Sequence, residues 1–245
     1  MRMRTAVKVA GLLGLLVTCA GAAEAQIGNL RRSAQRAAAG PSPEIAQLLA
    51  RIDSTRSRFD QATYLLNQSA LVMEASVATA ERRAEIRREL ESAGTLEQRT
   101  GENRIQLNAE DRTQRLEEAT AQRRFEQQQL SAQQSANVSA AGFNGVLAAM
   151  MDARALDDAR RLTGEASQAA SSIANDPAMA VYAGRLSQAA TTQLPAIVNT
   201  VPTQTRLATA ISNASRQASA ANRAVQVTEA VPAGSAPRPI DVNAI

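Results

Sequence analysis

The sequence predicts an all-α protein with no sheet, and three observations support this prediction. Residues of high helix propensity, mainly Ala, Gln, Arg and Glu, dominate the middle of the chain. Apolar residues recur there at steps of three and four, which is the spacing of one helix face. Only 12 Gly and 8 Pro interrupt the 245 residues, and clusters of β-branched or aromatic residues are missing. We therefore expect a long antiparallel coiled-coil helical hairpin on a small helical-bundle base.

The N-terminus has the pattern of a secretory signal peptide over residues 1–25. Three basic residues precede an apolar run over residues 9–20, and Ala23-Glu24-Ala25 follows it. The run is shorter than the ~20 residues that a membrane-spanning helix needs. We expect cleavage near Ala25 and a periplasmic or secreted protein that begins at Gln26.

An alternative maturation site lies inside the same segment. Leu16-Val17-Thr18-Cys19 resembles the lipobox, the motif at which a bacterial cysteine is lipidated and becomes the new N-terminus. Thr18 departs from the Gly, Ala or Ser that this motif has at its third position, which favours cleavage after Ala25. Lipidation of Cys19 would instead give a lipoprotein anchored to a membrane.

Removal of residues 1–25 leaves a narrow set of reactive side chains. The segment takes three basic and one acidic residue with it, so the net charge falls from +4 to +2, and every remaining basic residue is Arg. No His, Lys, Cys or Trp remains, which excludes catalysis by His or Cys, Schiff bases, thiolate or imidazole metal sites and disulfides. Arg and Glu alternate without a basic cluster, so we predict no nucleic-acid binding. We also predict no cofactor, no metal and no enzymatic activity.

The strongest pattern is a heptad repeat that predicts a long helix over residues 43–92. Residues 26–42 have too few apolar side chains to hold a helix and are expected to form a mobile leader. Ser42 and Pro43 mark the helix start, because Ser is a favoured N-cap and Pro suits the first helical position. The heptad positions are Ile45, Leu49, Ile52, Arg56, Phe59, Thr63, Leu66, Ala70, Met73, Val77, Ala80 and Ala84.

A second helix is expected over residues 96–135, folded back on the first to complete a hairpin over residues 43–135. Its apolar stripe is thin and interrupted by charged residues, so the preceding helix is the expected partner. The outer half of the hairpin, residues 81–124, is expected to be a solvated arm with ion pairs such as Asp111 with Arg115.

Three shorter helices are expected to form the base over residues 136–230. Pro177 starts the second of them and Pro195 ends it, because Pro fits the first turn of a helix and cannot continue one. The last is expected to begin at Thr203. Residues 231–245 are rich in Pro and are expected to form a disordered tail.

The densest apolar cluster after the heptads lies on the first helix of the base and is a candidate binding surface. Packing in the core is the ordinary role of such a stripe, and a partner groove or a membrane-inserting face is the alternative. The Arg-rich run near residue 85 is a second candidate surface, although its charges nearly balance. The predicted partner-binding residues are Phe143, Leu147, Met150, Met151, Arg83 and Arg87.

These features predict a secreted or periplasmic helical scaffold, or partner-binding protein, in an envelope or secretion assembly. It would act through coiled-coil contacts or self-assembly. One alternative is an amphipathic membrane-surface binder, which needs an exposed Phe143 helix or a lipidated Cys19. Another is a cell-wall glycosidase with paired carboxylates, although the aromatic residues that would bind a sugar are scarce and solvated helix faces are expected for the acidic residues. The candidate carboxylates are Asp152, Asp157, Asp158 and Glu165.

Overall fold

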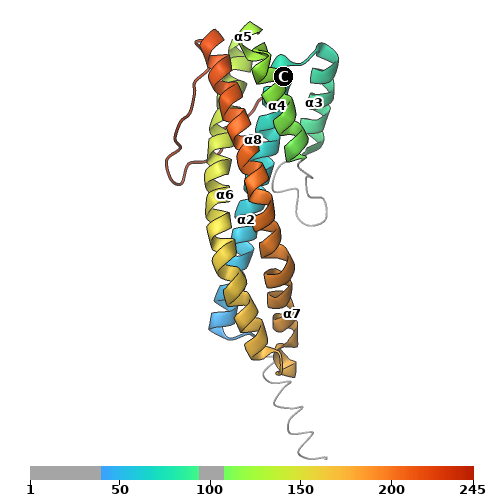
Figure 1. Cartoon of the computed structure of the whole chain (residues 1–245), viewed down its shortest axis with the longest axis vertical. Helices are drawn as coiled ribbons and strands as arrows, with labels where there is room; N and C mark the ends of the chain where they lie inside the picture. The colour runs from blue at the N-terminus through green and yellow to red at the C-terminus, as the bar shows by residue number, and fades with distance from the viewer. Residues whose placement is uncertain (1–39, 94–107) are drawn as a thin grey trace, which may run out of the picture.

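The structure is a computed structural model that describes residues 40–93 and 108–245. All regular structure in these two ranges is helical, which confirms the all-α prediction. Three long helices run side by side along the molecule (Figure 1): α2 (Pro43–Val77), α6 (Ala132–Ile173) and α8 (Leu194–Ala221). The predicted signal peptide, Cys19 and the predicted leader up to residue 39 lie outside the described residues.

α2 begins where the sequence predicts. The Ser42 hydroxyl accepts a hydrogen bond from the Ile45 N–H at 3.4 Å, and Pro43 occupies the first turn. The heptad positions from Ile45 to Met73 are all buried or half-buried. The heptad pattern therefore identified the face of α2 that packs against the other helices.

The predicted helix over residues 43–92, and its hairpin with a helix over residues 96–135, differ from the structure. The long helix stops at Val77, and α3 (Ala80–Ala93) starts with the Thr79 hydroxyl accepting from a main-chain N–H of its first turn. α2 packs chiefly against α6 and α8. These two helices bring the apolar faces that bury most of its seam, and the described part of the predicted partner contributes fewer apolar side chains to the core.

The predicted second helix is also divided within residues 108–135; its residues 96–107 lie outside the described residues. α4 (Ala109–Ala121) ends before Arg123, whose φ of 52° is left-handed, and the short α5 (Arg124–Gln127) follows. Both pack against α8. Ile86 of α3 and Leu116 of α4 are fully buried, so the described part of the predicted solvated arm, residues 81–93 and 108–124, contributes to the core instead.

α6 starts at a capping box inside the region assigned to the predicted second helix. Ser131 accepts from the Gln134 N–H at 3.2 Å, and the Gln134 side chain accepts from the Ser131 N–H at 3.0 Å. The helix ends at Ile173, close to the break predicted before Pro177. A Ser followed by Gln three residues later is a sequence signal for this start.

The structure has no boundary at Pro195 or Thr203, where the sequence predicts a helix end and a helix start. α7 (Ala180–Gln188) continues through a π-helical turn (Ala189–Gln193) directly into α8. Pro195 stands in the first turn of α8, where Pro is well tolerated. Pro202 lies inside α8, and buried residues on both sides of it keep the helix in contact with α2 and α6.

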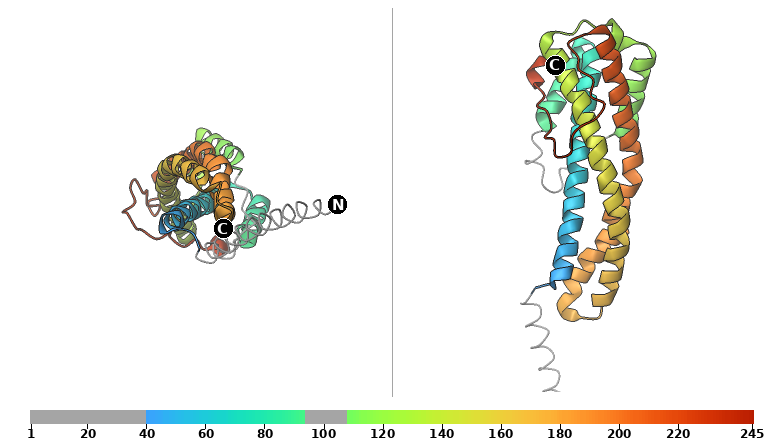
Figure 2. Two further views of the ribbon diagram at one scale, coloured as in Figure 1. Left: turned by 90° about the horizontal axis from the view of Figure 1, so that it is seen from below. Right: turned by 90° about the vertical axis from the view of Figure 1, so that its left-hand side faces the viewer.

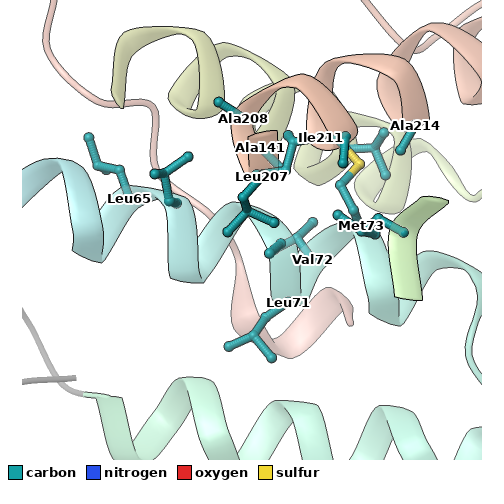
Figure 3. Close-up of a cluster of buried hydrophobic side chains, with 14 of the residues drawn as sticks. Leu65, Leu71, Val72, Met73, Ala141, Leu207, Ala208, Ile211 and Ala214 are labelled. Carbon is teal, nitrogen blue, oxygen red and sulfur yellow. The ribbon is translucent and has the colours of Figure 1, made fainter. Parts of the chain in front are cut away.

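The three long helices bury two apolar clusters, one in each half of the bundle. The first cluster joins the end of α2, the beginning of α6 and the end of α8; Figure 3 shows Met73 beside Ile211 and Ala214. The second cluster joins the beginning of α2, the end of α6, α7 and the beginning of α8, and includes Ile52 and Leu194. This pairing makes α6 antiparallel to α2 and α8.

Residues 231–245 do not form the predicted disordered tail. They follow an extended path over α6 and finish in a short 3₁₀ turn (Val242–Ala244) that contacts α3 and α6 (Figure 2). Val225, Val231 and Ile245 are buried in the first apolar cluster. The tail has no long regular element, as Pro-rich composition predicts, but it is packed on the bundle.

Candidate functional site

Residues 238–245, called here the terminal segment, lie along α6 and are held through their main chain. The Asn137 side chain accepts from the N–H of Asp241 at 2.9 Å and donates to its carbonyl at 2.7 Å. The Asn144 side chain accepts from the N–H of Arg238 at 2.8 Å and donates to its carbonyl at 2.9 Å. Each amide therefore clamps one residue through two hydrogen bonds that do not involve the side chain of that residue.

The spacing of the two Asn residues matches that of an extended chain. Seven residues of α-helix rise by about 10.5 Å, and three residues of extended chain advance by about 10 Å. Asn137 holds residue 241 and Asn144 holds residue 238, so the terminal segment runs antiparallel to α6 with this register. A helix with Asn at positions seven apart can thus bind an extended segment at every third residue.

Side chains complete the contact. The Arg238 guanidinium lies 4.1 Å from the centre of the Phe143 ring, a cation–π distance. Ile245 is buried and lines a pocket between α2 and α6. Arg87 of α3 donates to the main-chain oxygen of Ile245. The surface that receives the terminal segment is called here the α6 groove, and its polar and aromatic residues are Arg87, Asn137, Phe143 and Asn144.

Two of the predicted partner-binding residues, Phe143 and Arg87, lie in the α6 groove and contact the terminal segment. The sequence prediction missed Asn137 and Asn144, which are 5% and 1% exposed. The role of a polar residue on an apolar helix face cannot be assigned until the position of the segment that it binds is known. The seven-residue spacing of these two Asn residues was the available signal.

The other predicted partner-binding residues do not contact the terminal segment through any hydrogen bond. Leu147 is buried in the first apolar cluster, and Met150 and Met151 are half-buried against it. Arg83 lies on α3 with a buried Nε that has no hydrogen-bond partner. The apolar face around Phe143 is therefore mostly covered. Within residues 40–93 and 108–245, no helix has both the length and the apolar character to cross a bilayer.

Asp152 is fully buried inside the bundle, which corrects the expectation of a solvated helix face. It is 0% exposed and lies between the two apolar clusters, with Ala148 in the first and Ala155 in the second. Burial raises the pKa of its carboxyl from 3.8 to about 7, because the charged form loses its hydration. This carboxyl is therefore poised to gain or lose a proton near neutral pH.

Gln204 of α8 joins the Asp152 carboxyl to Thr63 of α2. One end of its amide lies 3.0 and 2.8 Å from the two carboxyl oxygens, and the other lies 2.8 Å from the Thr63 hydroxyl. With its nitrogen toward Asp152, the amide donates to both oxygens of an ionised carboxylate. With its nitrogen toward Thr63, the amide donates to that hydroxyl, which donates in turn to the Phe59 carbonyl at 2.9 Å. In the second arrangement the Gln204 amide oxygen faces the Asp152 carboxyl, so Asp152 must be protonated to donate a hydrogen bond to it.

The remaining candidate carboxylates lie apart from Asp152. Asp158 pairs with Arg58 of α2 at 2.7 Å. Glu165 pairs with Arg51 at 2.8 Å, and this hydrogen bond lowers the pKa of the Glu165 carboxyl. Asp157 is exposed. The structure does not gather these residues into one site, and among the described residues no acidic cluster has a metal-binding arrangement.

A further polar cluster surrounds Glu74 at the end of α2. Its Oε1 atom accepts from Arg82 of α3 at 2.8 Å and from Arg115 of α4 at 3.0 Å, and Arg112 lies 3.7 Å from Oε2. Arg115 also pairs with Asp111 at 2.9 Å, which confirms that predicted ion pair. Glu74 thus ties α3 and α4 to the bundle, where the sequence predicted a solvated arm.

The three sites have different surroundings. The bundle encloses Asp152 with Gln204 and Thr63, and the Glu74 cluster links helices of the same chain. The α6 groove lies on the outside of the bundle. No protein family, curated protein or solved structure matches this chain. The functional argument therefore depends on the chemistry of these sites, of which the groove is the one that already holds a polypeptide segment.

Proposed function

We propose that this protein is a secreted or periplasmic scaffold, without enzymatic activity, that holds an extended polypeptide segment within an envelope or secretion assembly. The observation that carries the proposal is the binding of residues 238–245 along α6 by Asn137 and Asn144. Hydrogen bonds to the main chain give affinity for any extended segment, and pockets for side chains give selectivity.

The shape of the bundle supports a role in holding and spacing. α6 has 42 residues, which corresponds to a length of about 63 Å. The groove occupies the first part of α6, near α3, so the end of the bundle formed by α7 lies away from it. Such a molecule can position one partner at a fixed distance from another.

The side chains that remain after the predicted cleavage support a role in binding and not in catalysis. The chain has no His, and its single Cys and its Lys precede the predicted cleavage point. Asp152 has the most perturbed pKa among the described residues, but the bundle encloses it and a substrate in solution cannot reach it. Of the other candidate carboxylates, Asp158 and Glu165 pair with Arg side chains and Asp157 faces solvent.

The test is cross-linking in the native host, followed by purification of a tagged protein and identification of the attached chains by mass spectrometry. We expect the double variant Asn137→Ala and Asn144→Ala to lose partners that the unaltered protein captures. The matched control is Asn213→Ala, which removes an exposed Asn of α8. Identical partner sets for the double variant and the control would exclude the α6 groove as the binding surface.

A separate measurement tests the proposed localisation. Intact mass of the protein purified from the envelope fraction is expected to correspond to a chain that starts at Gln26. A mass that corresponds to a diacylated Cys19 would replace the secreted form with the lipoprotein form. Recovery of an uncleaved chain in the cytoplasm would refute both.

A further inference from the structure

We infer that the α6 groove is an interface between copies of this chain, in which the terminal segment of one copy binds the groove of a second copy. The inference rests on the proposed binding function and names its partner as the protein itself. Exchange of an identical element between protomers is an economical route to a dimer, because the interface already exists within each chain.

The first argument is that the contacts of the terminal segment do not depend on its covalent connection. The four hydrogen bonds to Asn137 and Asn144, the Arg238 contact with Phe143 and the Arg87 bond to Ile245 all involve residues 238–245 alone on one side. A terminal segment from a second copy has the same residues and can form the same set of contacts. Exchange therefore preserves the interaction energy of the groove.

The second argument is the connection that precedes the terminal segment, residues 232–237. Val231 is anchored in the first apolar cluster, whereas the connection is exposed apart from half-buried Ser235. Ser235 closes a turn in the connection with two hydrogen bonds to the Pro232 carbonyl oxygen. The Ser235 N–H donates at 3.2 Å and the Ser235 hydroxyl donates at 2.8 Å. Gly234 has a φ of 81°, a turn conformation that Gly leaves readily. Opening this turn exposes no apolar side chain of the connection.

The third argument is reach and geometry. Six extended residues span about 20 Å, which is enough for the terminal segment to leave its own groove and enter an adjacent one. The groove lies on the outer side of the bundle, where another copy can approach it (Figure 2). Reciprocal exchange fills both grooves and produces a closed twofold pair. Binding within one chain benefits from a high effective concentration, so exchange should increase with protein concentration.

The test uses the chain from residue 26 to residue 245, which has no Cys, and two differently tagged variants. Ser76 and Ala244 line the same pocket, one on α2 and one in the terminal segment. One variant carries Ser76→Cys and the other carries Ala244→Cys. We mix them at increasing concentration, add a short bifunctional maleimide and identify the linked peptides by mass spectrometry. We expect a link between position 76 of one tagged chain and position 244 of the other, with a yield that rises with concentration.

Two further variants connect this link to the groove and to the connection. Asn144→Ala in both chains should make the link form about tenfold faster after mixing without changing its final yield, because release of the terminal segment no longer breaks two hydrogen bonds that the closed and exchanged forms share; Asn213→Ala should leave the rate unchanged. Gly234→Val in the Ala244→Cys chain should raise the yield, because Val is strained at the φ of 81° that the closed turn requires.

A chain that carries both Cys substitutions verifies that the two positions can be linked. If it cross-links internally while the mixtures give no link between tags at any concentration, even with Gly234→Val, the exchange is refuted. An equal rate of link formation with Asn144→Ala and Asn213→Ala would also overturn it. If no exchange is found, the proposed capture of other partners is still decided separately by the cross-linking experiment in the host.

Discussion

Replacing Asp152 with Asn is expected to stabilise the fold near neutral pH and to have little effect in acid. The folded pKa is about 7 and the ordinary value is 3.8. Between these values the unfolded chain releases the proton while the folded chain retains it, so the free energy of unfolding falls as pH rises. The fall begins near the ordinary pKa and is complete above the folded pKa. Asn cannot ionise, so the variant avoids this loss.

The size of the effect follows from the width of that interval. Each pH unit corresponds to about 1.4 kcal/mol, and about three units separate the two pKa values, which gives ~4 kcal/mol above pH ~7. This is an upper bound, because the Gln204 amide can donate to both oxygens of the ionised carboxylate and stabilise it. Below pH ~3 the carboxyl of the unaltered protein is mostly protonated in both states, and the two proteins should have nearly equal stability.

Urea unfolding followed by circular dichroism, at several pH values between about 3 and 8, measures this difference. The chain contains no His, so no other side chain has an ordinary pKa in the middle of that range. Asp157→Asn, at an exposed position on the same helix, is the control and should run parallel to the unaltered protein. A stability difference for Asp152→Asn that does not grow with pH would refute the assignment of the buried titration.

Two further predictions concern the packing of the bundle and are tested by thermal or urea unfolding. Gly145→Ala should destabilise the protein by ~1–3 kcal/mol, because its Cβ would lie 2.9 Å from Cγ2 of Ile211. Gly164→Ala, with nothing within 4 Å of the new Cβ, should stabilise it by ~0.5–1 kcal/mol; a gain at both positions would show that α6 and α8 are less closely packed. Glu74→Ala should cost ~1–3 kcal/mol and reduce protection of α3 and α4 from hydrogen exchange, since the Arg side chains around it lose their acceptor. The exposed Glu117→Ala should change stability little, and equal effects at both Glu positions would contradict the role of Glu74.

The sequence by itself determined the features that depend on neighbours along the chain. The N-cap at Ser42, the buried face of α2 and the Asp111–Arg115 pair involve residues within about one helical turn or one continuous helix. Helix propensity and 3.6-residue periodicity are local properties, so they predict which residues form helices and which side of a helix becomes buried. The Pro-rich composition of residues 231–245 likewise indicated a segment without a long helix, although the predicted disorder was wrong.

Only the tertiary structure decided which faces meet. A heptad seam fits a two-helix hairpin as well as a three-helix bundle, so the pattern of α2 could not show that α6 and α8 cover it. Asp152 continues a buried stripe composed mostly of Ala, which marks a face poorly because Ala is also common on exposed helix surfaces. The terminal segment became ordered because two Asn side chains about 100 residues earlier satisfy its main-chain N–H and C=O groups. Contacts between residues so distant in sequence leave no periodic signal along the chain, and they exist only once the helices have placed the groove.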